Sequence, residues 1–204
     1  MKLYYAPGAC SLAPHIVARE AGLSLDLDQL DFATRTTASG RPFAEINPKG
    51  YVPALALDDG EVLTEVSALV QYLADRAPGA GLVPEAGTSE RYRLLEWLGF
   101  LSTEIHKGFG PLWNPTTPEA VKEATRDRLF QRFAYLDQQL AGRSYLMGAH
   151  FTVADAYLFT VVNWTNFHGL SLAAYPNLSA FMGRVAARPA VREALQAEGL
   201  QKAA

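Results

Sequence analysis

The sequence predicts an α/β domain followed by an all-α domain, and three observations support this prediction. Segments with strand and helix patterns alternate over the first 76 residues, which is typical of a layered α/β domain. A stretch rich in proline and glycine, from Ala77 to Gly87, has the composition of a linker. Only helical periodicity follows it. We therefore expect two domains, residues 1–80 and 87–204.

The first elements form a strand, a helix and a second strand. Residues 2–5 are an apolar strand, which Pro7 and Gly8 end. From Leu12 the apolar residues recur with helical spacing until Gly22 ends the helix. Residues 23–28 alternate between apolar and polar with period two, which predicts a second strand and completes a βαβ unit.

The rest of this domain is organised around a loop that contains Val52–Pro53. A polar loop at 33–42 and a short helical piece at 43–46 precede it. A cis bond before Pro53 would turn the backbone of Val52 outward, where it can pair with an extended ligand; an ordinary loop before a strand is the alternative. Asp59–Gly60 predicts a hairpin turn, and a helix follows from Glu65 to about Arg76.

The second domain is predicted to contain only helices. A long helix has its apolar stripe at Leu94, Leu98, Leu101 and Ile105 and ends near 108–111. The next begins with Thr117 as N-cap and buries Leu129, Phe133, Leu136 and Leu140. A third, from Thr152 to about Phe167, opens with a capping box and is apolar almost all round, so we expect it at the buried centre. Two further helices span 177–188 and 189–197.

Composition excludes several classes of function. Apolar residues make up 49% of the chain and the net charge is −3, so we expect a globular protein without the basic surface that nucleic acids require. No segment has the length of a signal peptide or a membrane span, and the lone Cys10 agrees with a reducing compartment, so we expect a cytoplasmic protein that binds no membrane. We predict no metal site and no cofactor, because no ligand spacing or phosphate-binding glycine motif is present.

Cys10 is the first candidate for chemistry. A thiol at the start of a helix has its thiolate stabilised by unpaired N–H groups and the helix dipole, although a lone cysteine can equally be a small core residue. Redox enzymes with two thiols need Cys-X-X-Cys here, whereas this chain has Cys10–Ser11–Leu12–Ala13. A redox reaction at Cys10 would therefore require a second thiol from outside the chain.

Other candidates have ordinary structural alternatives. The hydroxyls of Tyr5 and Ser11 can bond a thiolate, or Tyr5 can pack in the core and Ser11 can cap the helix. Glu65 can bind an ammonium group or cap its own helix. The cations in the two nearest loops, Arg35 and Lys49, can bind carboxylates or stay solvated.

In the second domain, His106 and Lys107 lie late in the long helix. His106 is a candidate for chemistry, although a single histidine on a helix is more often a packing residue.

Motifs along essentially the whole chain together resemble those of the glutathione transferases, specifically the bacterial beta class. The matching segments are Met1–Tyr5, Pro7–Ser11, Asn47–Pro53, Leu63–Glu65, Gln71–Asp75, His106–Gly108 and Phe151–Phe159. The resemblance implies a thioredoxin-like N-terminal domain, an all-helical C-terminal domain, a homodimer, and glutathione as co-substrate with a hydrophobic electrophile.

The resemblance also implies roles for individual residues. Cys10, with Ser11, Tyr5 and His106, would lie near the glutathione sulfur. Glutathione contacts are implied for Arg35, Tyr51, Val52, Glu65, Val66, Glu104 and Lys107; among these, Glu65 would take the γ-glutamyl ammonium and the N–H of Val66 its carboxylate.

Two residues depart from the family pattern. Val66 stands where a serine or glycine is usual, which removes a hydroxyl contact, and Gly99 stands where asparagine is frequent. We therefore predict weaker or altered glutathione binding.

Two alternative functions are consistent with these sequence features. In the first, the chain is a transferase that conjugates glutathione to hydrophobic electrophiles, with thiol–disulfide exchange through Cys10 as a second activity. In the second, the same fold binds glutathione and apolar ligands with little turnover, with Phe109, Leu112, Trp113 and Tyr157 as lining residues. The intact Cys10, Val52–Pro53 and Glu65 favour the enzyme.

Overall fold

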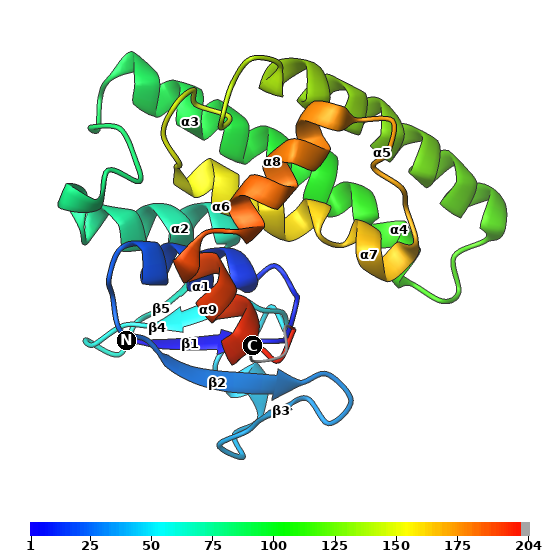
Figure 1. Ribbon diagram of the computed structural model, residues 1–204. Coiled ribbons are helices and arrows are strands. Elements are labelled where there is room, and N and C mark those ends of the chain that lie inside the picture. The colour runs from blue at the N-terminus through cyan, green and yellow to red at the C-terminus, as the bar shows by residue number, and fades with distance from the viewer. Residues whose placement is uncertain (201–204) are drawn as a thin grey trace. The chain divides into compact units, whose positions relative to one another are not determined.

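The computed structural model describes residues 1–200, which form two compact units (Figure 1). One unit contains Met1–Val83 together with residues 187–200, and the other contains Pro84–Ala186. The first carries a mixed sheet and the second is helical, so the predicted fold class is confirmed. The domain boundaries at 80 and 87 stay a prediction.

The sheet has five strands in the order β3-β2-β1-β4-β5. Parallel pairing joins β1 (Lys2–Tyr5) to β2 (Asp26–Asp31) across the helix α1 (Leu12–Glu20), which confirms the βαβ unit. The other pairs are antiparallel and involve β3 (Thr36–Thr37), β4 (Ala54–Ala56) and β5 (Val62–Thr64).

Two details of the sheet were predicted wrongly. Strand β2 begins at Asp26, not at Leu23, because the N–H of Leu23 still bonds the carbonyl of Ala18 after Gly22 (φ 67°) ends α1. The stretch 33–42 is not a plain loop, since it contains the two-residue strand β3.

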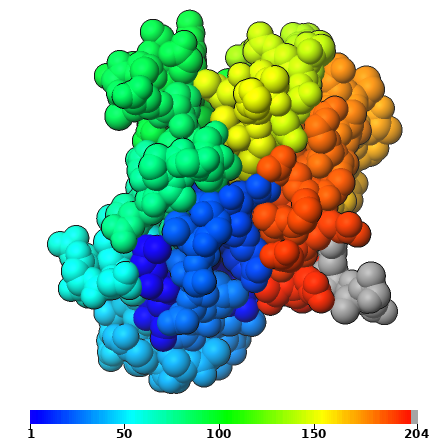
Figure 2. Space-filling view, turned by 60° about the vertical axis from the view of Figure 1, so that its left-hand side comes forward, coloured from blue at the N-terminus to red at the C-terminus, as the bar shows by residue number. Residues whose placement is uncertain are grey.

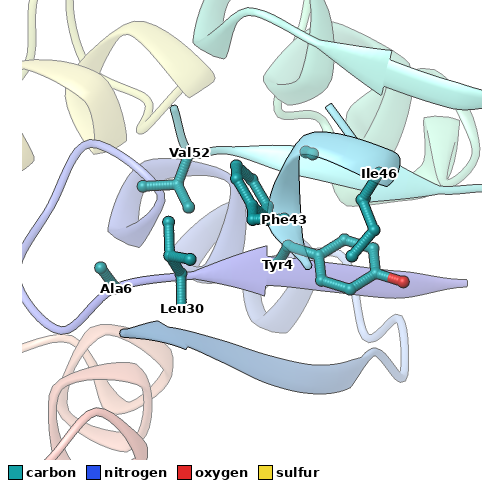
Figure 3. Close-up of a cluster of buried hydrophobic side chains, with 7 residues drawn as sticks. Tyr4, Ala6, Leu30, Phe43, Ile46 and Val52 are labelled. Atoms are coloured by element: carbon teal, nitrogen blue, oxygen red, sulfur yellow. The ribbon is translucent and has the colours of Figure 1, made fainter. Parts of the chain in front are cut away.

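Successive residues of β1 point to opposite faces of the sheet. Tyr5 points to the face covered by α1, where its ring lies 6.4 Å from that of His15. Tyr4 points to the other face and meets Phe43 of η1 (Phe43–Glu45) at 6.2 Å. Figure 3 shows this second cluster, whose buried members are Tyr4, Ala6, Leu30, Phe43, Ile46, Val52 and Ala54.

The loop before β4 has the predicted conformation. The Val52–Pro53 bond is cis, and the predicted hairpin joins β4 to β5 with Gly60 at φ 90°. The helix α2 (Val66–Asp75) follows and packs against α1. This arrangement brings the loop 47–53 beside the start of both helices.

The last helix, α9 (Pro189–Ala197), packs on α1, and Figure 2 shows this red segment against the blue N-terminal one. Arg188 donates two hydrogen bonds to the carboxylate of Glu20, at 2.6 and 2.7 Å. The sequence places these residues with the helical domain, whereas in the structure the buried side chains of Val191, Ala194 and Leu195 attach them to the sheet unit.

The first helical segment of the second unit changes type along its length. The α-helix α3 (Ser89–Phe100) passes into a π-helix, η3 (Leu101–His106), then into η4 (Lys107–Phe109) and α4 (Gly110–Trp113). The predicted long helix is present, but it changes type along its length and continues to Trp113, past the predicted end near 108–111. π-Helical turns occur mostly as short insertions in α-helices, and they are frequent at functional sites.

The helix α5 (Glu119–Leu140) buries the four predicted residues. Its N-cap is Pro118 and not Thr117, and no side chain caps it. The helix α6 (Val153–Val162) is buried at every position, as predicted, and Thr152 and Asp155 form its capping box. It ends before the predicted limit, and α7 (Thr165–His168) starts anew. The unit ends with α8 (Pro176–Ala186).

Candidate functional site

Cys10 lies at the junction of β1 and α1. Its thiol donates a hydrogen bond to the carbonyl of Val52 at 3.2 Å, and the residue is 8% exposed. Ser11 is fully buried beside it, and its hydroxyl accepts from the N–H of Ala6 and donates to the Ala6 carbonyl, both at 3.2 Å. Ser11 makes no capping bond, so the alternative in which its side chain caps α1 is wrong. Its hydroxyl holds the loop below Cys10.

Tyr5 is packed in the core beside this loop. Burial raises the pKa of its phenol, and the charges of Glu198 and Asp28 raise it further, so the phenol stays protonated at neutral pH. The ring contact with His15 agrees with the packing alternative for Tyr5.

A buried polar network lies behind the Cys10 loop. The carboxylate of Glu198 accepts from the N–H of Gly8 and contacts Nδ1 of His15, both at 2.9 Å. Nε of Arg19 donates to Nε2 of His15 at 3.1 Å, so the ring proton is on Nδ1 and points at Glu198. Reading the sequence did not reveal this network, because Glu198 is 183 residues from His15 and no local pattern links them.

Glu65 lies at the start of α2 with a φ of 71°, which non-glycine residues rarely adopt. Its side chain makes no capping bond, so the capping alternative is wrong. Instead Oε1 accepts from Nζ of Lys49 at 2.9 Å and from the hydroxyl of Tyr51 at 2.8 Å. These contacts raise the pKa of Lys49 and that of Tyr51, because a carboxylate favours the protonated form of both.

The first turn of α2 leaves backbone donors available. The carbonyl of Glu65 accepts from the N–H groups of Ala68 and Leu69. The amides of Val66 and Ser67 precede these and have no carbonyl to bond within the helix. The side chain of Val66 is buried, so this residue offers its backbone only.

The loop 47–53 is held from both sides. Nδ2 of Asn47 donates to the carbonyl of Tyr51 at 2.7 Å, and the guanidinium of Arg35 donates to the carbonyl of Gly50 at 2.5 Å. Arg35 has a φ of 59°. Within residues 1–200 no hydrogen bond from the N–H of Val52 is recorded, and this donor adjoins the carbonyl that the Cys10 thiol contacts.

The sheet unit thus gathers most of the predicted site residues around one loop. Cys10 contacts Val52, Arg35 contacts Gly50, and Tyr51 contacts Glu65. Thiol, peptide N–H, carboxylate and guanidinium are the groups that an extended, zwitterionic thiol peptide can meet. The roles of the individual residues stay predictions.

Three predicted residues lie in the helical unit. Glu104 accepts from Arg132 at 2.7 Å and from Arg128 at 3.4 Å, and these hydrogen bonds and charges lower the pKa of its carboxyl. His106 is half-buried, and its Nδ1 lies 2.6 Å from the hydroxyl of Tyr157. Lys107 is exposed.

Two features are absent from the described part of the chain. The described part of the chain holds no group of three or more His, Cys, Asp or Glu side chains placed to hold a metal ion. None of the helices within residues 1–200 combines the length and the apolar character that crossing a membrane requires.

Comparison with known proteins agrees with the geometry. Residues 16–81 match the family model of the glutathione S-transferase N-terminal domain, and residues 100–189 match that of the C-terminal domain. Glutathione S-transferase GstA of Escherichia coli O157:H7 is 46% identical over 98% of this chain and 100% of its own length.

Two solved structures are similar over 98% of this chain and all of their own. A sphingomonad glutathione S-transferase complexed with glutathione is 48% identical with a TM-score of 0.95, and the bacterial beta class glutathione S-transferase of Sphingomonas chungbukensis is 47% identical with a TM-score of 0.95. The chain therefore belongs to the glutathione S-transferase family, in the bacterial beta class that its motifs predict.

Proposed function

We propose that this protein binds glutathione along the loop 47–53 and transfers its thiol to hydrophobic electrophiles. The observation that carries the proposal is the N–H of Val52, for which residues 1–200 provide no acceptor, in a loop whose Val52 carbonyl accepts from the thiol of Cys10 and whose Tyr51 hydroxyl donates to Glu65. Backbone donors beside a cis-proline pair with an extended peptide as an edge strand does. The sphingomonad relative, which was solved with glutathione, supports this choice of peptide.

Each charged end of glutathione has a matching group. The γ-glutamyl ammonium would join Lys49 and Tyr51 as a donor to Glu65, and the adjacent carboxylate would bond the amides of Val66 and Ser67 at the start of α2. Arg35 would bond the glycyl carboxylate, with Tyr51 lining the peptide. The cysteinyl sulfur would then lie near Cys10 at the start of α1.

The start of α1 favours a negatively charged sulfur, since helix N-termini stabilise anions. In conjugation the glutathione thiolate attacks an electrophilic carbon, the carbon–sulfur bond forms and the leaving group departs with its electron pair. Tyr5 and Ser11 support the loop, and His106, Lys107 and Glu104 are the residues that we assign to the site from the helical unit. The chain would act as a cytoplasmic homodimer.

Cys10 would add thiol–disulfide exchange. Its thiolate attacks a glutathione-containing disulfide, a mixed disulfide forms and the other thiolate leaves; a second glutathione thiolate then releases Cys10 and yields oxidised glutathione. This sequence needs no second cysteine in the chain.

The test compares wild-type protein with Cys10→Ala in two assays. We expect conjugation of an aryl halide to persist in Cys10→Ala, while glutathione transfer to a small disulfide falls at least tenfold, because only the exchange needs a covalent sulfur. Equal loss of both activities would contradict the assigned role of Cys10.

The alternative is a binding protein with little turnover. Glutathione binding by calorimetry with no conjugation of any aryl halide or epoxide tested would favour it over the enzyme. Absence of glutathione binding at millimolar concentration would refute both.

A further inference from the structure

Lys49 holds a cation of the protein itself against the carboxylate of Glu65. Its Nζ donates to Oε1 of Glu65 and to Oγ1 of Thr64, both at 2.9 Å. The backbone of Lys49 is held as well, because its N–H donates to the side-chain carbonyl of Asn47 at 3.1 Å. These contacts distinguish Lys49 from a surface lysine that only water surrounds.

The same carboxylate oxygen accepts from a second residue of the loop 47–53. The hydroxyl of Tyr51 donates to Oε1 of Glu65 at 2.8 Å. Glu65 has a φ of 71°, and a non-glycine residue keeps such a conformation only where the surrounding structure enforces it, often at a ligand site. The fold therefore turns this carboxylate toward two donors of the loop, and one of them carries a full positive charge.

Lys49 balances the charge of Glu65 in the protein without ligand. The hydrogen bond to Glu65 and the charge of that carboxylate raise the pKa of Lys49, so its side chain stays protonated at neutral pH. A ligand ammonium that binds Glu65 then meets a carboxylate with a cation already beside it. The two ammonium groups repel each other, and water and salt reduce this repulsion without abolishing it.

We propose that Lys49 is a specificity-determining residue that weakens the selection for the α-ammonium group of the ligand, so that thiol peptides without this group also serve as co-substrates. This inference rests on the glutathione site proposed above and deepens it. When a ligand lacks the ammonium, Lys49 and Tyr51 still donate to Glu65. The α-carboxylate of such a ligand still meets the amides at the start of α2, and its thiol reacts as that of glutathione does.

The test compares two peptides by calorimetry. Glutathione and glutaryl-cysteinylglycine differ only in the α-amino group, so the ratio of their Kd values measures what the ammonium contributes. We expect wild-type protein to bind both. In Lys49→Met we expect the ratio to rise at least about fivefold, the effect of two unit charges about 4 Å apart in water. The variant is expected to fold, because the side chain of Lys49 is 49% exposed and its ion pair contributes little to stability.

Two further variants control for the charge and its position. Lys49→Arg keeps a cation within reach of Glu65, and we expect a ratio within about twofold of the wild type. Lys2→Met removes the same charge from the first residue of β1, which pairs with Ala56 in the sheet, and we expect an unchanged ratio. An equal rise in Lys2→Met would mean that net charge and not Lys49 sets the selection, and would refute the inference.

Turnover with a fixed aryl halide gives a second measure. Because the thiol is the same in both peptides, we expect their kcat values in the wild type to agree within about threefold and the effect of Lys49→Met to appear in KM. An unchanged Kd ratio in Lys49→Met, or a change in kcat alone, would overturn the inference.

The same experiment separates this inference from the proposed function. Wild-type protein that binds glutathione but not glutaryl-cysteinylglycine at millimolar concentration would refute the inference alone. Wild-type protein that binds neither peptide would refute the glutathione site, and the inference with it.

Discussion

The helices α1 and α2 pack against each other on the same sheet, and a residue that we assign to glutathione lies just before each of them, Cys10 before α1 and Glu65 before α2, yet the two starts are built differently. Cys10 is 8% exposed and its loop is fixed by the buried groups of Ser11 and Glu198. The side chain of Glu65 is 55% exposed and its partners Lys49 and Tyr51 are exposed as well.

This difference in burial predicts that the two helix starts contribute to different properties of the protein, one to its stability and the other to its affinity for glutathione. Buried polar groups that lose a partner cost the full desolvation penalty, whereas exposed ion pairs are screened by water and contribute little to folding. We therefore expect changes near Cys10 to act mainly on stability and changes at Glu65 to act mainly on affinity.

The largest effect is expected at Glu198. Glu198→Ala removes the buried carboxylate that accepts from the N–H of Gly8 and contacts Nδ1 of His15, and we expect the free energy of unfolding to fall by about 3–5 kcal/mol in urea titrations. Glu193→Ala is the control, since Glu193 is exposed on the same helix and pairs with Arg19; its effect is expected to stay below about 1 kcal/mol. Similar losses of unfolding free energy in both variants would contradict the expectation that the buried carboxylate contributes more to stability than the exposed one.

Glu65→Gln is expected to have the opposite profile. The unfolding free energy changes by less than about 1 kcal/mol, because the ion pair with Lys49 is exposed. The Kd for glutathione, measured by calorimetry, rises roughly 10- to 100-fold, since a bond between ammonium and carboxylate contributes about 1.5–3 kcal/mol. Glu61→Gln on the exposed hairpin serves as control and leaves both quantities unchanged.

Ser11→Ala tests the buried start on a smaller scale. It removes the acceptor of the Ala6 N–H, and we expect a loss of about 1–3 kcal/mol in unfolding free energy. Ser67→Ala, in the first turn of α2, is expected to lose less than about 0.5 kcal/mol. Equal losses at the two serines would mean that burial does not distinguish the two helix starts.

Val66→Ser restores the hydroxyl that is usual in the family. We expect the Kd for glutathione to fall roughly 2- to 10-fold, the contribution of one added hydrogen bond. Gly99→Asn is the companion variant, because Gly99 is exposed and an added Cβ would meet no atom within 4 Å. Unchanged affinity in Val66→Ser would mean that the backbone donors of α2 suffice.

The smallest effect is a shift in titration. The hydrogen bond to Glu65 and the charge of this carboxylate raise the pKa of Tyr51. Glu65→Gln keeps an acceptor but removes the charge, so Tyr51 ionises at lower pH than in the wild type. Ultraviolet difference spectra of alkaline titrations, with Tyr51→Phe to identify the signal, measure this shift; a higher pKa in the variant would contradict it.

Local signals predicted much of the fold and part of the site. Thr152 and Asp155 predicted the start of α6, since a capping box depends on neighbouring residues. Val52–Pro53 by itself left the cis bond and an ordinary loop as alternatives, and the structure has the cis bond. The π-helix η3 was missed because Leu101 and Ile105 keep the apolar spacing of an α-helix and are buried in either form.

The contacts between distant residues were not predictable. No pattern in one sequence pairs Glu198 with Gly8 or Tyr157 with His106, which are 190 and 51 residues apart. Glu65 was predicted as a binding residue, but its partners Lys49 and Tyr51 depend on how the cis-proline loop folds back onto α2.

The return of α9 to the sheet unit has a consequence for synthesis on the ribosome. The N-terminal strands and helices emerge first, but the acceptor for the Gly8 amide and for His15 is translated only after the whole helical unit. The loop that presents the thiol therefore reaches its final shape only after the helical unit has been translated, so a nascent chain displays Cys10 before it can hold the cysteine in place.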